Sequence, residues 1–159
     1  MPDMLVRLYD MPEINGEGRL AEEGITIKRA MPLDKDEILE FVAKNFWNKW
    51  VNECEQAIFN QPSSCYIAVK DKKILGFACY DATALGFFGP TGVAEDQRDK
   101  GIGKALLGKC LLSMKEKGYG YAIIGWVEDA VGFYEKAANA TIIEGSLPEK
   151  SVFKNLIAR

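Results

Sequence analysis

The sequence predicts a single α/β domain built around a mixed β-sheet. Its 159 residues are enough to bury one sizeable core. Apolar residues make up 48% of the chain and charged residues 27%, as in soluble globular proteins. Short apolar runs of strand length alternate with segments whose apolar residues recur at helical spacing. Their order, β-α-α-β-β-β-α-β-α-β-β, is typical of a mixed α/β layer.

The N-terminal part differs from the rest of the chain. A strand-like segment over residues 4–9 is followed by turn-forming residues at 15–24. We therefore expect an N-terminal extension with a possible strand over residues 1–24, and one domain over residues 25–159. The elements expected in that domain are strands at 25–30, 65–69, 74–80, 85–93, 121–127, 141–144 and 152–157, and helices at 34–46, 47–59, 101–117 and 129–138.

Particular residues mark where several of these elements begin and end. Asp34 is a candidate N-cap of the first helix. The polar segment 70–73 separates two apolar runs and predicts a β-hairpin. Gly118 and Asn139 are expected to end helices, because both residue types adopt the left-handed conformation found there. Pro90 is expected to interrupt strand pairing and cause a bulge, since proline has no N–H to donate.

The chain contains no histidine, which excludes several classes of chemistry. Histidine-dependent nucleophilic triads, histidine general bases and histidine-containing zinc sites all require the missing imidazole. Zinc sites made of four thiolates normally pair their ligands about two to four residues apart, and this sequence has no such pair. We therefore expect no metal, reduced core thiols and a cytoplasmic protein. The four cysteines are Cys54, Cys65, Cys79 and Cys110, and the last three are expected in the core.

Bulk charge and hydropathy indicate neither a nucleic acid nor a membrane as partner. Twenty lysines and arginines against twenty-three acidic residues give a net charge of −3, which predicts no basic surface. No apolar run approaches the roughly 20 residues of a membrane span. Asp3, Arg7 and Asp10 also argue against the apolar core of a signal peptide.

The most informative segment is residues 93–106, VAEDQRDKGIGKAL, where a strand ends in a polar loop that opens into an amphipathic helix. Gly101 and Gly103 remove side chains where the loop meets the helix, so backbone N–H groups can approach a ligand closely. The helix N-terminus carries roughly half a positive charge, which favours bound phosphate groups. Three basic side chains add whole charges beside it: Arg98, Lys100 and Lys104.

Two other phosphate-binding motifs do not fit this segment. A dinucleotide-binding G-x-G-x-x-G would need its third glycine at Leu106. A Walker loop would need a glycine at Arg98 and a serine or threonine at Ala105. The segment therefore predicts a pyrophosphate cradle of another kind, and the alternative is a glycine-containing turn before a surface helix.

The pattern Arg98-x-x-Gly101-x-Gly103 after a strand resembles the acetyl-CoA-binding motif of the GNAT N-acetyltransferase family. The run VAEDQRDKGIGKALL is similar to the family's usual V-x-P-x-Y-R-G-K-G-I-G-x-x-L-L. It departs from that pattern at Glu95, Gln97 and Asp99. The arginine and the loop glycines of the pattern are present.

A second segment extends the resemblance. AVGFYEK, at residues 130–136, is similar to the end of the family's N-x-x-A-x-x-[LF]-Y-E-K, although Val127 stands at the asparagine position. The resemblance covers about 130 residues, and its specific motifs lie between residues 93 and 136. It implies the acyl-CoA N-acyltransferase (GNAT) fold, with a mixed sheet of about six to seven strands flanked by about four helices.

The resemblance also implies how acetyl-CoA binds. Two parallel strands would splay apart at residues 92–94 and 123–125, and the pantetheine arm would bind along the first of them. A backbone N–H near Val93 would then polarise the thioester carbonyl. The cofactor-binding residues carried over are Gly92, Val93, Ala94, Arg98, Asp99, Lys100, Gly101, Ile102, Gly103, Lys104, Ala105 and Tyr134.

The same resemblance makes Tyr134 the acid that protonates the departing thiolate. A phenol with a pKa near 10 stays protonated at neutral pH and suits an alkyl thiolate; packing on the sheet is the alternative role. The strand expected at 85–93 contains no acid that could serve as general base. Asp81, at the end of the preceding strand, is the candidate base acting through water, and a turn residue is its alternative role. An amine of lowered pKa would need only water.

Aromatic residues where the first two helices meet are candidates for the acceptor pocket, because helices cover that site in similar enzymes. Phe46 is expected in the core, whereas Trp47 and Trp50 are candidates to contact the acceptor.

We therefore expect an N-acetyltransferase that transfers the acetyl group of acetyl-CoA directly to a primary amine of a small molecule. A protein N-terminus is the other acceptor left open. A CoA-binding sensor without turnover is the alternative function, and an interaction domain without cofactor is a third. The strand expected at 152–157 offers an edge for a possible homodimer.

Overall fold

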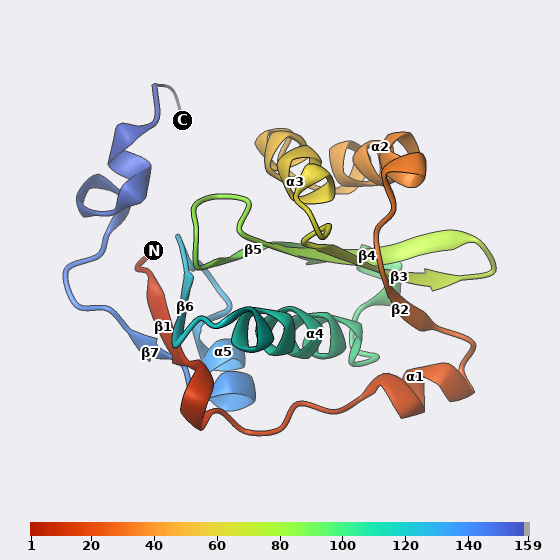
Figure 1. Cartoon of the computed structure of the whole chain (residues 1–159), viewed down its shortest axis with the longest axis horizontal. Helices are drawn as coiled ribbons and strands as arrows, with labels where there is room; N and C mark the ends of the chain where they lie inside the picture. Colours follow the sequence, from red (N-terminus) through yellow and green to blue (C-terminus); the bar gives the residue numbers. More distant parts are fainter. Residues whose placement is uncertain (158–159) are drawn as a thin grey trace.

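Seven strands form one mixed sheet in the computed structural model, which describes residues 1–157 (Figure 1). The strands are β1 Met4–Arg7, β2 Thr26–Arg29, β3 Cys65–Lys70, β4 Lys73–Tyr80, β5 Phe87–Val93, β6 Tyr121–Ile124 and β7 Thr141–Ile142. Their order in the sheet is β2-β3-β4-β5-β6-β1-β7. All neighbouring strands are antiparallel except β5 and β6, which are parallel.

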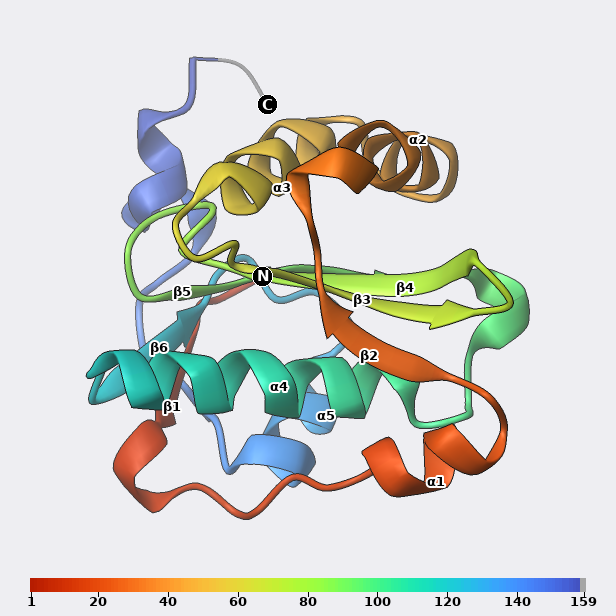
Figure 2. The ribbon, with the colours of Figure 1, turned by 45° about the vertical axis from the view of Figure 1, so that its right-hand side comes forward.

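Helices cover both faces of the sheet. They are α1 Glu17–Glu22, α2 Lys35–Asn45, α3 Lys49–Phe59, α4 Ile102–Lys117 and α5 Val131–Ala138. Figures 1 and 2 show α2 and α3 on one face, and α4 and α5 on the other. A separate apolar core fills the space on each side, one containing Leu106 and the other Phe77. The mixed α/β fold predicted from the sequence is confirmed. No helix in residues 1–157 is long and apolar enough to cross a membrane.

Local signals placed most of the turns correctly. Asp71 and Lys72 have positive φ values of 50° and 64° between β3 and β4, as a two-residue hairpin turn requires. Gly118, with φ 110°, ends α4, and Asn139, with φ 52°, ends α5. Asp34 precedes α2 as expected, but its side chain makes no capping hydrogen bond.

The pairing of β4 with β5 is irregular opposite Pro90. Ala78 pairs with Thr91 and Tyr80 with Phe88, so two residues of β5 stand opposite one of β4. This is the bulge expected from a proline that cannot donate to the ladder.

The N-terminal strand belongs to the sheet. β1 lies between β6 and β7, where Met4 pairs with Ile124 on one side and Ile142 on the other. The side chains of Met4 and Val6 are fully buried in the core beneath α4 and α5. The domain boundary at residue 25 stays a prediction, but the strand before it shares this core.

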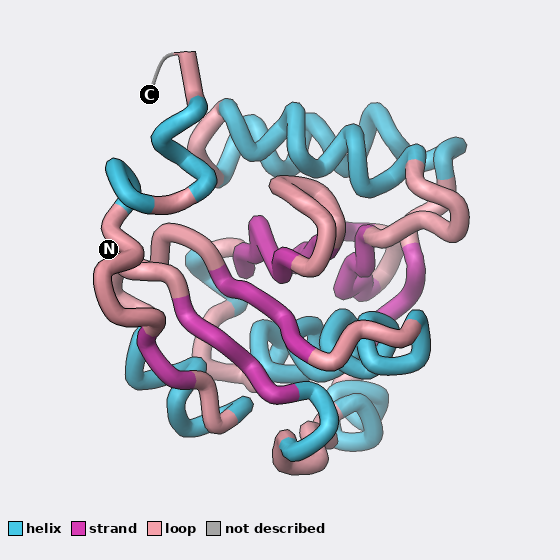
Figure 3. Tube along the Cα trace, turned by 60° about the vertical axis from the view of Figure 1, so that its left-hand side comes forward, coloured by secondary structure: helices cyan, strands magenta, loops and turns pink. Residues whose placement is uncertain are grey.

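The strand predicted over residues 152–157 is wrong. The C-terminal segment forms two 3₁₀ turns, Pro148–Lys150 and Val152–Asn155, and runs on the α2 and α3 side of the sheet (Figures 1 and 3). The ring of Phe153 packs against Gly125, just beyond β6, and this contact takes the segment away from the sheet edge at β7. Pairing of a strand at 152–157 across a homodimer therefore has no basis in the fold.

β5 and β6 separate soon after they begin to pair. Their register contains only Phe87 with Ile123 and Phe88 with Ile124, among the residues that the structure describes. The rest of β5, which pairs with β4 as far as Val93, therefore has a free edge facing β6. The parallel strands therefore separate, as the family resemblance implied, but Ile123 and Ile124 are paired and the separation begins after them rather than at residues 123–125.

Candidate active site

A pocket of about 450 Å³ lies at the free edge of β5. Its lining draws on the cores of both faces of the sheet. Phe88 and Tyr134 belong to the core beneath α4 and α5, whereas Phe46 and Trp50 pack against the core beneath α2 and α3. A ligand entering from one face can therefore meet a ligand from the other. The lining residues are Phe46, Trp50, Phe88, Thr91, Gly92, Val93, Arg98, Gly103, Leu107, Ala130, Phe133 and Tyr134.

The loop before α4 brings backbone donors to this pocket. The helix hydrogen bonds begin at Ala105, whose N–H donates to the Gly101 carbonyl at 3.1 Å. The N–H groups of residues 102–104 precede that bond and have no partner within the helix, which leaves them for a ligand. Gly101 has a φ of 89°, a left-handed conformation that glycine adopts without strain, and it turns the chain into the helix.

The alternation of the β5 backbone directs polar groups into the pocket. The Ala94 N–H donates to the Leu75 carbonyl at 2.9 Å, so it points toward β4. Because successive residues of a strand point their amide groups to opposite sides, the N–H and C=O of Val93 point away from β4 and toward the gap. The Val93 carbonyl accepts a hydrogen bond from Nε of Arg98 at 3.3 Å, which places that guanidinium beside the pocket.

The structure separates the predicted cofactor-binding residues into two groups. Gly92, Val93, Arg98, Gly103 and Tyr134 line the pocket. The others lie in the adjoining loop and first helical turn: Ala94, Asp99, Lys100, Gly101, Ile102, Lys104 and Ala105.

The side chains of three residues in the second group make contacts within the protein that do not involve the pocket. Ile102 and Ala105 are buried in the core under α4, so only their backbone can face a ligand. Nζ of Lys100 donates to Oε1 of Gln97 at 2.8 Å.

Tyr134 lies in α5 with its ring edge-to-face against Phe88, at 6.2 Å between centroids. The side chain is 6% exposed, and burial raises the pKa of its hydroxyl well above the usual value, so it stays protonated. The hydroxyl makes no hydrogen bond within residues 1–157. Every fully buried side-chain nitrogen or oxygen in those residues has a hydrogen-bond partner, so the hydroxyl oxygen is not fully buried. The oxygen is therefore open to the pocket.

Asp81 is not among the residues that line the pocket. Its Oδ2 accepts from Nζ of Lys117 at 2.7 Å, and its Oδ1 accepts from the Tyr119 hydroxyl at 2.9 Å and the Gly86 N–H at 2.8 Å. Both carboxylate oxygens are thus occupied by donors from the end of α4 and the turn before β5. The arrangement suits a structural role in that turn.

Sequence reasoning missed several residues that line the pocket. Phe46 packs on Phe77 and Trp50, as its expected core role requires, but it also covers Gly92 and faces the pocket. Trp50 reaches the pocket as predicted, whereas Trp47 is not among its lining residues. Phe88 and Leu107 lie outside the family motifs, and the apolar run of β5 and the helical spacing of apolar residues in α4 signal only that they are buried.

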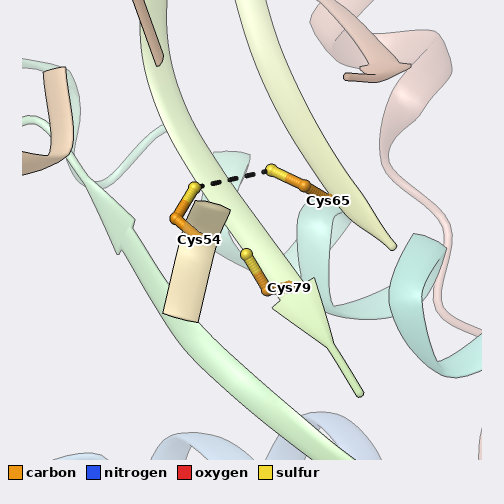
Figure 4. A group of neighbouring side chains, drawn as sticks. All are labelled: Cys54, Cys65 and Cys79. Atoms are coloured by element: carbon orange, nitrogen blue, oxygen red, sulfur yellow. Dashed lines mark hydrogen bonds between the residues drawn. The ribbon is translucent and has the colours of Figure 1, made fainter. Parts of the chain in front are cut away.

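Three of the four cysteines lie together, away from the pocket. The Sγ atoms of Cys54, Cys65 and Cys79 lie within 4.8 Å of one another, and those of Cys54 and Cys65 are 3.9 Å apart (Figure 4). All three side chains are fully buried in the core beneath α2 and α3, and burial raises the pKa of the Cys79 thiol. Cys65 and Cys79 pack as small core residues, as expected, and Cys54 lies in the same core without having been predicted there. The absence of a metal stays a prediction.

A sequence model described as the Acetyltransferase (GNAT) family matches residues 29–139, more than half of the chain. The matched region runs from β2 to the end of α5 and so contains the loop before α4 and Tyr134. No protein among the curated sequences matches this chain.

Solved structures share the fold at low identity. One is a region of a fungal multi-domain β-N-acetylglucosaminidase, described as a GCN5-related glucosamine N-acetyltransferase, with a TM-score of 0.72 and 17% identity over 89% of this chain and 19% of that chain. A GCN5-related N-acetyltransferase from Sphaerobacter thermophilus has a TM-score of 0.68 and 22% identity over 89% of this chain and 48% of that chain. This chain thus spans about a fifth of the first protein and about half of the second.

A third similar structure is a GNAT family acetyltransferase from Brucella melitensis, solved with acetyl-CoA. It has a TM-score of 0.54 and 19% identity, over 78% of this chain and 91% of that chain. At these identities, the likeness to all three structures shows a common fold.

Proposed function

The chain belongs to the GNAT acetyltransferase family, and we propose that it transfers the acetyl group of acetyl-CoA directly to the nitrogen of a primary amine of a small molecule. The observation that carries this proposal is the pocket at the free edge of β5. It lies beside the helix N-terminus of α4 on one side, contains Tyr134, and includes residues from both faces of the sheet.

The α4 end of the pocket suits the phosphate groups of acetyl-CoA. Free N–H groups at residues 102–104, the positive end of the helix and the Arg98 guanidinium converge there. Gly103 lines the pocket without a side chain, so a pyrophosphate can approach its backbone. The free edge of β5 then supplies N–H and C=O groups for the amides of the pantetheine arm.

Bound acetyl-CoA supplies an activated thioester, and the chain's own groups assist its cleavage by the amine. The new bond joins the amine nitrogen to the carbonyl carbon, and the bond from that carbon to sulfur breaks. The Val93 N–H stabilises the negative charge that develops on the carbonyl oxygen. Tyr134 donates its proton to the departing sulfur, and the proton lost by the amine returns to the phenolate through water.

We assign Asp81 to the fold rather than to proton transfer. The donors on both of its carboxylate oxygens hold the chain between β4 and β5, and none of its contacts reaches the pocket. No aspartate or glutamate is among the lining residues in the described chain, so water takes up the amine proton.

The lack of an acidic lining residue also favours the second candidate, a CoA-binding sensor without turnover. Acetyl-CoA should bind with micromolar affinity in calorimetry under both functions, whereas only the transferase releases free thiol when an amine is present. The measurement is thiol release from acetyl-CoA by the full chain across a panel of primary amines. Binding of acetyl-CoA without thiol release from any amine would favour the sensor, and failure to bind acetyl-CoA would overturn both.

A further inference from the structure

Aromatic rings cover the separated strands on the α2 and α3 face of the sheet. A β-carbon on Gly92 would lie only 2.5 Å from the ring of Phe46, and one on Gly125 would lie 2.7 Å from the ring of Phe153. Both rings therefore sit directly on glycines, one on β5 and the other just after β6. Glycine at these two positions allows large side chains from elsewhere in the fold to lie against the opening between the strands.

Each of these two rings belongs to a small aromatic group that includes tryptophan. The rings of Trp47 and Trp126 are 6.2 Å apart, those of Trp126 and Phe153 are 5.1 Å apart, and those of Phe46 and Trp50 are 5.6 Å apart. We call these five residues the aromatic collar. Its members come from the junction of α2 and α3, from the loop after β6 and from the C-terminal segment, which lies on the same face as α3 (Figure 3).

A buried carboxylate holds one half of the collar in place. Oδ1 of Asp3 accepts a hydrogen bond from the backbone N–H of Trp126 at 2.9 Å, and Oδ2 of Asp3 accepts one from the Ser151 hydroxyl at 2.6 Å. Asp3 is 6% exposed, so these charge-assisted hydrogen bonds are shielded from water. The loop after β6 and the C-terminal segment are thereby fixed to the start of β1.

Among the described residues, no carboxylate lines the pocket itself. Asp3 is engaged as above, and the Glu53 carboxylate on α3 accepts a hydrogen bond from the Thr83 hydroxyl. The charged lining residue in the described chain is Arg98, which has the same sign as an ammonium group. A polyamine or an aminosugar would lose hydration there and find few partners in return, whereas an aromatic ring would find rings to pack against.

We propose that the acceptor is an aromatic primary amine without further charged groups, whose ring packs against Phe46 and Trp50, the collar residues that line the pocket. This inference rests on the proposed transfer reaction and adds the class of acceptor. An apolar wall favours the neutral amine over its ammonium form. The neutral amine is also the nucleophile, so no protein base is needed to deprotonate it before the attack, and the proton released afterwards leaves through water as proposed above. The collar residues act as specificity determinants for the acceptor, and Phe46 and Trp50 are the members expected to contact it.

The first test compares acceptors in the thiol-release assay. 3-Phenylpropylamine is paired with 3-cyclohexylpropylamine, which has the same chain and a saturated ring, and kcat/KM is expressed per concentration of neutral amine. Spermidine and glucosamine represent the polycationic and aminosugar classes. We expect kcat/KM for the phenyl compound to exceed that of each of the others by about tenfold or more.

The second test changes the collar and leaves acetyl-CoA binding as an independent readout. Trp50→Leu should lower kcat/KM for 3-phenylpropylamine about tenfold with no change in acetyl-CoA affinity by calorimetry, and Trp50→Phe should restore most of the loss. Phe59→Leu is the matched control, because Phe59 lies exposed at the far end of the same helix. It should leave both quantities at wild-type values.

The outcomes distinguish failure of the proposed acceptor class from failure of the proposed transfer reaction. The aromatic acceptor would be overturned if 3-cyclohexylpropylamine, spermidine or glucosamine had a kcat/KM equal to or above that of 3-phenylpropylamine, or if Trp50→Leu and Trp50→Phe caused equal losses. The transfer reaction would remain standing. Thiol release from none of the amines, with acetyl-CoA bound, would overturn the transfer reaction and the acceptor class together.

Discussion

The ammonium group of Lys117 lies 2.7 Å from Oδ2 of Asp81 and joins the end of α4 to the chain between β4 and β5. The Asp81 side chain is 2% exposed and that of Lys117 is 51% exposed, so the pair connects the interior to the surface. Tyr119 and the Gly86 N–H complete the contacts of the same carboxylate. Because its carboxylate accepts all of these hydrogen bonds, Asp81 stabilises the turn between β4 and β5.

Replacement of Asp81 tests this structural role against its predicted role as a base. Asp81→Asn keeps the size of the side chain and suits the backbone, because Asp81 has a φ of 53° and asparagine tolerates that conformation. Loss of the charge should lower the free energy of unfolding by about 1–3 kcal/mol, as expected for a damaged buried network. Turnover per folded molecule should stay near wild type. A 100-fold loss of turnover with unchanged stability would return Asp81 to the mechanism.

Tyr134→Phe separates catalysis from packing in α5. The ring and its edge-to-face contact with Phe88 remain, and no hydrogen bond of the described chain is lost, so stability and acetyl-CoA affinity should change little. The rate with an active amine should fall by on the order of 10²–10⁴-fold, the usual contribution of a positioned acid. Turnover and unfolding are measured on the same preparation. Wild-type turnover would withdraw the hydroxyl from the reaction.

Gly103→Val tests the phosphate-binding loop. A β-carbon at Gly103 would meet only Cγ2 of Val93, at 3.7 Å, which is an ordinary contact, so the fold should persist. The added methyl groups would enter the pocket where the phosphates are expected, and acetyl-CoA affinity measured by calorimetry should fall at least about tenfold, or ~1.4 kcal/mol. Gly120→Val, at a position with open space around it, is the matched control. Affinity within about twofold of wild type for Gly103→Val would refute the cradle.

Glu53→Gln should make stability less dependent on pH. Burial on α3 raises the pKa of the Glu53 carboxyl, so the folded state holds this proton more tightly than the unfolded chain does. The wild-type protein should therefore lose stability as pH rises from the unfolded glutamate value, about 4.3, through the raised folded value. Glutamine keeps an oxygen for the Thr83 hydroxyl and carries no charge.

Urea unfolding at pH 4 and pH 8 measures this effect. The stability of Glu53→Gln relative to wild type should increase between the two values. Glu55→Gln, which replaces an exposed carboxylate on the same helix, is the control and should show no comparable gain. A constant difference between Glu53→Gln and wild type at both values would contradict a raised pKa.

The sequence by itself was sufficient for the features that neighbouring residues decide. The left-handed conformations of Gly118 and Asn139, and the turn at residues 71–72, follow from local backbone sterics. The loop from Arg98 to Lys104 is contiguous, so its glycines and its charges predict a phosphate-binding helix start before any tertiary contact is known. The same holds for the periodic apolar face that carries α4 across the sheet.

The tertiary structure alone decided which distant residues meet. Cys65 and Cys79 are brought together by the register of β3 and β4, which no cysteine spacing encodes. The strand-like segment at residues 152–157 does not join the sheet. Instead, the ring of Phe153 packs on Gly125, 28 positions earlier in the chain, where the lack of a side chain makes room for it. Such contacts depend on packing between elements rather than on local preference, so the same apolar residue can fill a core, cover a strand or line a pocket. The proposed acceptor side consists mostly of residues of this kind, and among them the sequence predicted Trp50 at the pocket but not Phe46.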